Sequence, residues 1–338
     1  MKKFPEVFSI FVVYLLTVPT NVMCLGAFTE VWLNDFCISR IQLACLYLWA
    51  TVMVFVVMLF NKHIFSTKKA FLLLSFVSFA LTVLPYVKGM LFLFFFMSQW
   101  LGQGCLVGQC RCRLFTIIQP SRYGCVIGLL EALGTCAVFL CPFLGLLSIH
   151  QWGWQATLYL LALIYFCAAF TFKVPQKISE VNVCEIYKDV KFWIANFIIY
   201  LPVILVSGLF FHLEGICECY NISLQTWAYV SQVQAPGIIV GQVLFGCFWR
   251  KSTESSVGLL FVLIFSQIVW VVNLFNFHFT ICVVCGILGW SLFGVLVNTF
   301  WGYLYRKQTM FIDESIKASV GFGFLANALG PILLCVFI

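Results

Sequence analysis

Residues 90–110 read MLFLFFFMSQWLGQGCLVGQC; residues 111–122, RCRLFTIIQPSR, follow, and then residues 123–147, YGCVIGLLEALGTCAVFLCPFLGLL. Each apolar stretch is long enough to cross a bilayer as a helix, which needs about 20 mostly apolar residues. Gly104 and Gly108 remove the side-chain barrier to close contact between membrane helices. The basic segment between the two stretches is expected to be a loop on the cytoplasmic side. The region therefore predicts a membrane hairpin whose first helix packs closely against a neighbour.

The composition places the rest of the chain in a membrane as well. Hydrophobic residues make up 63% and charged residues 9% of the 338 positions, whereas soluble domains carry about 25% charged residues. The N-terminal apolar stretch is longer than that of a signal peptide and lacks a small-x-small cleavage site after it, so it is expected to be a retained helix. Eleven spanning helices are predicted, at residues 7–28, 41–60, 69–87, 89–110, 123–147, 154–172, 192–212, 226–249, 256–276, 279–304 and 316–338.

The basic residues are distributed unevenly between the loops that these helices define. With the N-terminus in the cytoplasm, all of the 19 Lys and Arg residues except Arg40 and Lys88 fall on the cytoplasmic side. Cytoplasmic loops of membrane proteins carry an excess of Lys and Arg. The sequence therefore predicts a cytoplasmic N-terminus and, because eleven is odd, a C-terminus on the opposite side.

The order of these features resembles the fourth and fifth helices of bacterial members of the major facilitator superfamily. A Leu-Gly-Gln-Gly run at residues 101–104, a basic loop, a Gly-rich helix ending in Cys141-Pro142, and Gly153-Trp154 follow one another. The family often has glycine before this proline, and Cys141 in its place weakens an expectation of antiport. Gly330-Pro331, six helices later, echoes the same pattern. The resemblance implies an all-α membrane fold of two six-helix bundles related as a pseudo-repeat, here with about eleven helices.

The longest hydrophilic segment divides the chain into two bundles. The expected units are an N-terminal six-helix bundle at 1–172, a cytoplasmic linker at 173–191, and a C-terminal bundle of five helices at 192–338, incomplete because a twelfth helix is missing. The loop LFNKHIFSTKK at 59–69 also lacks the aspartate and glycines that the family carries there. A split reading frame, a degenerate transporter and a sensor that has lost transport all remain open as explanations.

The resemblance implies a secondary active transporter that moves a small polar or anionic metabolite by alternating access. A carboxylate is one candidate solute, and the proton is a candidate coupling ion. The alternative is a transport-deficient membrane sensor or receptor of the same fold, or a truncated remnant. The expected location is the bacterial cytoplasmic (inner) membrane, as a multi-pass monomer. The expected partners are the bilayer, the solute and protons, without nucleic acid.

Nothing in the sequence indicates an enzyme. It contains no phosphate-binding loop, no His and carboxylate cluster, and no Ser/His/Asp arrangement that fits the topology. The Cys-x-Cys pairs at 110–112 and 217–219 lack the Cys or His partners of a zinc site. No cofactor and no metal are therefore expected.

Glu131 is the only acidic residue well inside a predicted span. It lies about eight residues, or ~12 Å, into its helix. An ionised carboxylate in hydrocarbon costs several kcal/mol unless it is paired or hydrated. We interpret Glu131 as a candidate proton carrier. A neutral, hydrogen-bonded structural glutamate, or one close enough to the helix end to meet water, is the alternative.

Other polar residues at membrane depth are candidates for solute binding. The resemblance implies a central cavity lined mainly by the first, fourth, seventh and tenth helices. Ordinary hydrogen bonds between helices are the alternative role for each candidate, and His212 is expected to be solvated at the outer rim. The candidates are Asn21, Gln99, Gln103, Asn196, Tyr200, Gln234 and Asn298.

Overall fold

A computed structural model of the chain describes residues 4–17, 26–60, 67–118, 120–171, 188–212 and 312–334. Every regular element in these ranges is helical, so the all-α prediction is confirmed. The predicted spans at 226–249, 256–276 and 279–304 lie outside the described residues. The elements are α1 (Phe4–Thr17), η2 (Gly26–Phe28), α3 (Thr29–Phe36), α4 (Arg40–Phe60), α5 (Thr67–Val83), η3 (Leu84–Tyr86), α6 (Met90–Ile117), α7 (Pro120–Trp152), α8 (Trp154–Thr171), α9 (Val190–Phe211) and α15 (Ile312–Leu334).

Five segments of the described chain are long and apolar enough to cross a membrane. They present large apolar side chains outward, such as Trp49, Leu72 and Phe94, which are 62%, 65% and 55% exposed. Exposed apolar surface of this extent suits hydrocarbon rather than water, and helices satisfy their backbone hydrogen bonds internally. The chain is a multi-pass membrane protein, with these segments at Arg40–Leu59, Lys68–Tyr86, Met90–Leu114, Trp154–Thr171 and Ser315–Leu333.

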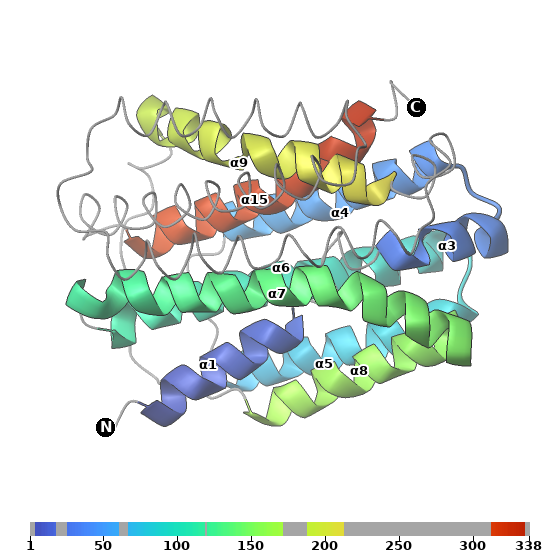
Figure 1. Ribbon diagram of the computed structural model, residues 1–338, viewed down its shortest axis with the longest axis horizontal. Helices are drawn as coiled ribbons and strands as arrows, with labels where there is room; N and C mark the ends of the chain where they lie inside the picture. Colours follow the sequence, from blue (N-terminus) through green and yellow to red (C-terminus); the bar gives the residue numbers. More distant parts are fainter. Residues whose placement is uncertain are drawn as a thin grey trace, which may run out of the picture.

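Helix α6 occupies the middle of the helix assembly. It packs against α1, α4 and α5, and also against α15 near the other end of the chain. Helix α15 packs in turn along α9 and α4. Figure 1 shows α4, α9 and α15 on one side of α6 and α7, with α1, α5 and α8 on the other. We refer to α1–α8 as the N-terminal helices, and to α9 and α15 as the C-terminal helices.

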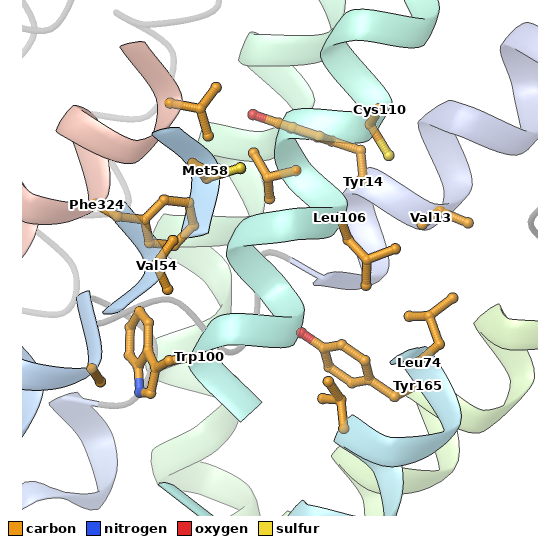
Figure 2. Packing of buried hydrophobic residues seen from close by; sticks show 14 of the residues in the cluster. Val13, Tyr14, Val54, Met58, Leu74, Trp100, Leu106, Cys110, Tyr165 and Phe324 are labelled. Atoms are coloured by element: carbon orange, nitrogen blue, oxygen red, sulfur yellow. The ribbon is translucent and has the colours of Figure 1, made fainter. Parts of the chain in front are cut away.

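The glycines of α6 lie where neighbouring helices come closest. A Cβ atom added at Gly104 would overlap the Val54 side chain of α4, and one added at Gly108 would overlap Met58. Both Val54 and Met58 are buried beside α6 (Figure 2). The predicted close contact of this helix therefore exists, and α4 is the partner helix.

The expected loop at 111–122 is helical over most of its length. Helix α6 continues to Ile117 and α7 begins at Pro120. The arginines at 111 and 113 do not end the helix, because each has a carboxylate partner, and Leu114 and Ile117 continue the buried face. Assigning the basic residues to a loop was therefore wrong for Arg111 and Arg113.

The Gly-Trp pair at 153–154 forms the turn between α7 and α8. Gly153 has a φ of 82°, a left-handed conformation that favours glycine. The indole Nε1 of Trp154 donates a hydrogen bond of 2.6 Å to Oδ2 of Asp35, in the last turn of α3. The turn thereby fixes α8 against α3.

Candidate functional site

A charged cluster joins α1, α6 and α7 inside the bundle. Arg111 Nη2 of α6 lies 2.8 Å from Oε1 and 2.9 Å from Oε2 of Glu131 on α7. The same nitrogen donates to the Tyr14 hydroxyl of α1 at 3.1 Å, and that hydroxyl lies 3.3 Å from Glu131 Oε2, to which it donates. The Arg111 guanidinium carbon also lies 5.8 Å from the centre of the Tyr14 ring. Three helices therefore share one hydrogen-bonded ion pair.

The cluster is shielded from solvent. The Arg111 and Glu131 side chains are 12% and 9% exposed, and Tyr14 is 5% exposed. Taking one charge out of water costs several kcal/mol, which a partner of opposite charge and further hydrogen bonds can offset. Arg111 and Glu131 supply that compensation to each other, and Tyr14 adds a hydrogen bond to each.

The C-terminal helices reach the same cluster through Tyr200. The Arg111 guanidinium interacts electrostatically with the Tyr200 side chain of α9. The Tyr200 hydroxyl lies 3.4 Å from Ser319 Oγ of α15. A Cβ added at Gly323 of α15 would meet the Tyr200 ring, which places α9 and α15 close together at this point. Helix α15 also packs against α4 and α6. The cluster therefore lies where the N-terminal and C-terminal helices meet.

Two more basic side chains are buried near this part of the bundle. Arg113, 7% exposed, lies 3.4 Å from Glu6 at the start of α1, whose side chain is 43% exposed. Lys317 of α15 is 3% exposed and lies close to the buried Cys105 of α6. The basic residues of this region are thus placed partly within the helices.

Two predicted solute-binding residues have orphaned polar atoms. Gln99 is 1% exposed, and neither its amide oxygen nor its amide nitrogen has a hydrogen-bond partner among the described residues. Asn196 is fully buried; its Nδ2 donates to the Phe192 carbonyl one turn earlier, and its Oδ1 has no described partner. Among the described residues, neither side chain makes a hydrogen bond to another helix.

Only part of the predicted set can be compared with the structure. Glu131 and Tyr200 belong to the charged cluster, whereas Gln99 and Asn196 lie apart from its hydrogen bonds. The remaining candidates lie outside the described residues or, for Gln103, have a side chain that is not described; these are Asn21, Gln103, Gln234 and Asn298.

His212 was expected to be solvated, and this was wrong. It is 1% exposed, and its Nε2 lies 2.8 Å from the Pro331 carbonyl of α15. Helix α9 ends at Phe211 directly before it. The imidazole is covered because α15 continues past the end of α9, so that the ring joins the two C-terminal helices.

Tyr14 and Arg111 are the members of the cluster that sequence reasoning missed. Arg111 was assigned to a loop by the fall in hydropathy after residue 110. The available signal was an arginine and a glutamate near the joined ends of two consecutive antiparallel helices. Tyr14 gave no such signal, because a tyrosine in an apolar helix is more often a packing residue.

Comparison with solved structures identifies the architecture. A bacterial homologue of the human lysosomal transporter Spinster, inward-facing and unoccupied, matches with a TM-score of 0.65 and 12% identity, covering 97% of this chain and 80% of that one. Its inward-facing, occupied form matches with the same TM-score and identity over 96% and 80%. The human organic anion transporter MFSD10 (TETRAN) matches with a TM-score of 0.64 and 12% identity over 98% and 93%. No protein-family model and no curated protein matches the sequence.

These likenesses show that the chain has an all-α fold shared with membrane transporters of known structure. At 12% identity they concern the fold alone. The chain shares the all-α fold of these solved structures, so the all-α membrane fold expected from the resemblance in residues 101–154 is confirmed.

Proposed function

We propose that the protein is a secondary active transporter that moves a small organic anion by alternating access, coupled to a proton carried by Glu131. The observation that supports it best is the buried Arg111–Glu131 pair, placed where the N-terminal and C-terminal helices meet. Ionisable residues inside membrane helices are expensive and are typical of ion and substrate pathways.

The pair provides a direct link between proton and anion. While Glu131 is ionised, both of its carboxylate oxygens lie against Nη2 of Arg111 and compensate the positive charge. Protonation removes the negative charge and leaves a buried cation without full compensation. A carboxylate or similar anion can then replace it, since guanidinium binds such groups through parallel N–H donors. Proton and anion therefore bind together more favourably than either does alone.

Tyr200 makes the cluster sensitive to the relative position of the helices. It approaches Arg111 from α9 and Ser319 from α15. If the two sets of helices move apart during transport, Arg111 loses this neighbour. An organic anion is also the solute named for one of the transporters of similar fold, the human protein MFSD10.

The test is flux in vesicles that contain the purified full chain. Labelled succinate, gluconate and naphthalene-2-sulfonate serve as probe anions, with an inward proton gradient. At least one should accumulate. Glu131→Gln keeps the shape and hydrogen bonding of the side chain but cannot ionise, so exchange of internal for external anion should persist while uphill accumulation fails.

Glu6→Gln is the matched control, because Glu6 also pairs with an arginine of α6 but is 43% exposed. It should leave accumulation unchanged. Accumulation by Glu131→Gln equal to that of the parent would reject the coupling role of Glu131. Absence of flux of all three anions in the parent would favour the sensor alternative.

A further inference from the structure

A cluster of aromatic rings joins the N-terminal and C-terminal helices away from the charged cluster. The Tyr47 ring of α4 lies 5.8 Å from that of Trp100 on α6 and 5.4 Å from that of Phe211 on α9, between ring centres. The Trp100 ring lies 6.3 Å from that of Phe324 on α15 (Figure 2). We call the set the aromatic seam; its members are Trp32, Tyr47, Phe96, Trp100, Phe211 and Phe324.

The seam contains several buried polar atoms without hydrogen-bond partners. The Tyr47 hydroxyl and the indole nitrogens of Trp32 and Trp100 have none among the described residues, and all three residues are fully buried. Gln99, adjacent to Trp100 in α6 and 1% exposed, has two unpartnered amide atoms. The Tyr47 hydroxyl and the two indole nitrogens of the seam, and the amide of Gln99 next to Trp100 in the sequence, are thus removed from water without a partner among the described residues.

Such atoms are costly. A buried donor or acceptor that lacks a partner costs about 1–3 kcal/mol, and native structures contain few of them. Phenylalanine at 47 and leucine at 99 would fill the same space without that cost. Packing alone therefore does not account for the polar groups in the seam.

Several other buried polar side chains of the described helices use a nearby backbone carbonyl, although some buried atoms outside the seam, such as Asn196 Oδ1, also lack a partner among the described residues. Thr51 Oγ1 donates to the Tyr47 carbonyl at 3.0 Å, and Ser207 Oγ donates to the Ile204 carbonyl at 3.1 Å. Ser78 Oγ donates to the Ala162 carbonyl of α8 at 2.7 Å. These three use backbone carbonyls, which the seam's hydroxyl, indole and amide groups do not.

We propose that the aromatic seam is a solute-binding surface for a ring-bearing organic anion. In this proposal, which rests on the transport function proposed above, the ring packs on Trp100 and Tyr47 when the two sets of helices part. The Tyr47 hydroxyl, the Trp100 indole and the Gln99 amide donate hydrogen bonds to oxygen atoms of the solute. Aromatic side chains with a polar end suit such a solute, because they offer apolar area and a donor together.

The aromatic seam and the charged cluster are two separate sites. Trp100 and Arg111 are eleven residues apart on one helix, or about 16 Å along its axis. A small solute cannot contact both at once, so it would meet the seam and Arg111 at different stages of passage. The seam selects the solute by its aromatic ring, and Arg111 binds its anionic group.

Binding of naphthalene-2-sulfonate to the purified full chain tests the proposal, with methanesulfonate as the probe that lacks the rings. Naphthalene-2-sulfonate should raise the thermal unfolding temperature of the parent, and methanesulfonate should not. Tyr47→Phe and Gln99→Leu should each weaken binding of naphthalene-2-sulfonate between about three- and tenfold, as expected for a lost hydrogen bond. Without the probe, both variants should unfold at the same temperature as the parent or a higher one.

Tyr165→Phe and Gln109→Leu are the matched controls. Tyr165 is fully buried on α8, and Gln109 is 4% exposed ten residues after Gln99 on the same helix. Both should bind naphthalene-2-sulfonate like the parent. The proposal fails if the parent shows no shift, if Tyr47→Phe and Gln99→Leu bind like the parent, or if both unfold at lower temperature without the probe.

Failure of this proposal is distinguishable from failure of the transport function. Glu131→Gln should bind naphthalene-2-sulfonate at least as tightly as the parent, because its Arg111 is open to the anion, even though it loses proton-driven accumulation. Normal seam binding in a parent that carries no anion across the vesicle membrane would overturn transport alone. Proton-driven accumulation of succinate with no naphthalene-2-sulfonate binding would overturn the seam alone.

Discussion

Arg111 occupies a position where a charge is tolerated only because of its neighbours. Glu131 compensates the positive charge of Arg111, the Tyr14 hydroxyl accepts a hydrogen bond from Arg111, and the Tyr200 side chain lies nearby on α9. Removing one partner of a buried pair typically costs ~3–5 kcal/mol, because the other charge remains buried, whereas replacing both can be nearly neutral. The pair is thus expected to contribute to function more than to stability.

This gives a prediction for the stability of variants. Arg111→Met should lower the thermal unfolding temperature in detergent clearly, because Glu131 then loses the guanidinium group that compensates its buried charge. The double variant Arg111→Met with Glu131→Gln should recover most of the loss while remaining unable to accumulate anion. A double variant less stable than Arg111→Met would show that the two side chains do not compensate each other.

The second arginine of α6 gives a contrasting prediction. Glu6 is 43% exposed and lies 3.4 Å from Arg113, so solvent screens the interaction. Glu6→Gln should change the free energy of unfolding by less than about 1 kcal/mol. A loss as large as that of Arg111→Met, measured in the same thermal assay, would contradict the assignment of Glu6 to the solvated end of α1.

At the scale of helices, the glycines of the described ranges come closest to a neighbouring helix where α15 crosses α9. A Cβ at Gly330 would overlap the Ile204 carbonyl and the Ser207 hydroxyl, and would lie 2.6 Å from the Gly208 nitrogen. Two of these three atoms belong to rigid backbone. His212 then bonds the Pro331 carbonyl just beyond this crossing. The two helices are held at a separation that only glycine permits.

Gly330→Ala should therefore destabilise the protein by several kcal/mol or prevent folding, since overpacking that moves backbone costs ~1–3 kcal/mol or more. Gly145→Ala is the matched control, because its added Cβ would make only an ordinary 3.4 Å contact with Ala27. Equal expression and equal unfolding temperature for the two variants would mean that α9 and α15 separate easily.

Two glycines of α6 are expected to differ in how much a larger side chain destabilises the protein. Gly104→Leu meets Val54, whose branched side chain is stiff at χ1, while Gly108→Leu meets the flexible end of Met58. The expected order of destabilisation is Gly104→Leu above Gly108→Leu. As the control, Leu91→Ala, at a position 59% exposed on the same helix, should have little effect on the unfolding temperature.

At the scale of the whole molecule, the orientation in the membrane is the prediction to check. The distribution of basic residues predicts that the N-terminus lies in the cytoplasm. A tag inserted at residues 37–39, between α3 and α4, should be accessible only from the outer side of intact cells. A tag at residues 118–119, between α6 and α7, should be accessible only after permeabilisation. The reverse pattern would invert the topology.

The fold was predictable from the sequence because hydropathy and helix length are local properties. The starts and ends of α4, α5 and α8 lie within two or three residues of the predicted spans, apart from the short η3 turn after α5. The site was predictable only in part. Glu131 was identified because it is an acid among apolar residues, whereas its pairing with Arg111 and Tyr14 depends on how three helices pack. Likewise, the burial of His212 depends on α15, which lies more than a hundred residues away.

The ion pair of Arg111 and Glu131 has a consequence for the membrane voltage. A buried elementary charge that crosses the whole field is worth ~2.3 kcal/mol per 100 mV. The empty pair carries no net charge, and the pair with one proton and one monovalent anion carries none either. If both forms reorient, this site moves no charge across the membrane in either direction. Uptake of a monovalent anion should then follow the pH difference and be indifferent to the electrical potential.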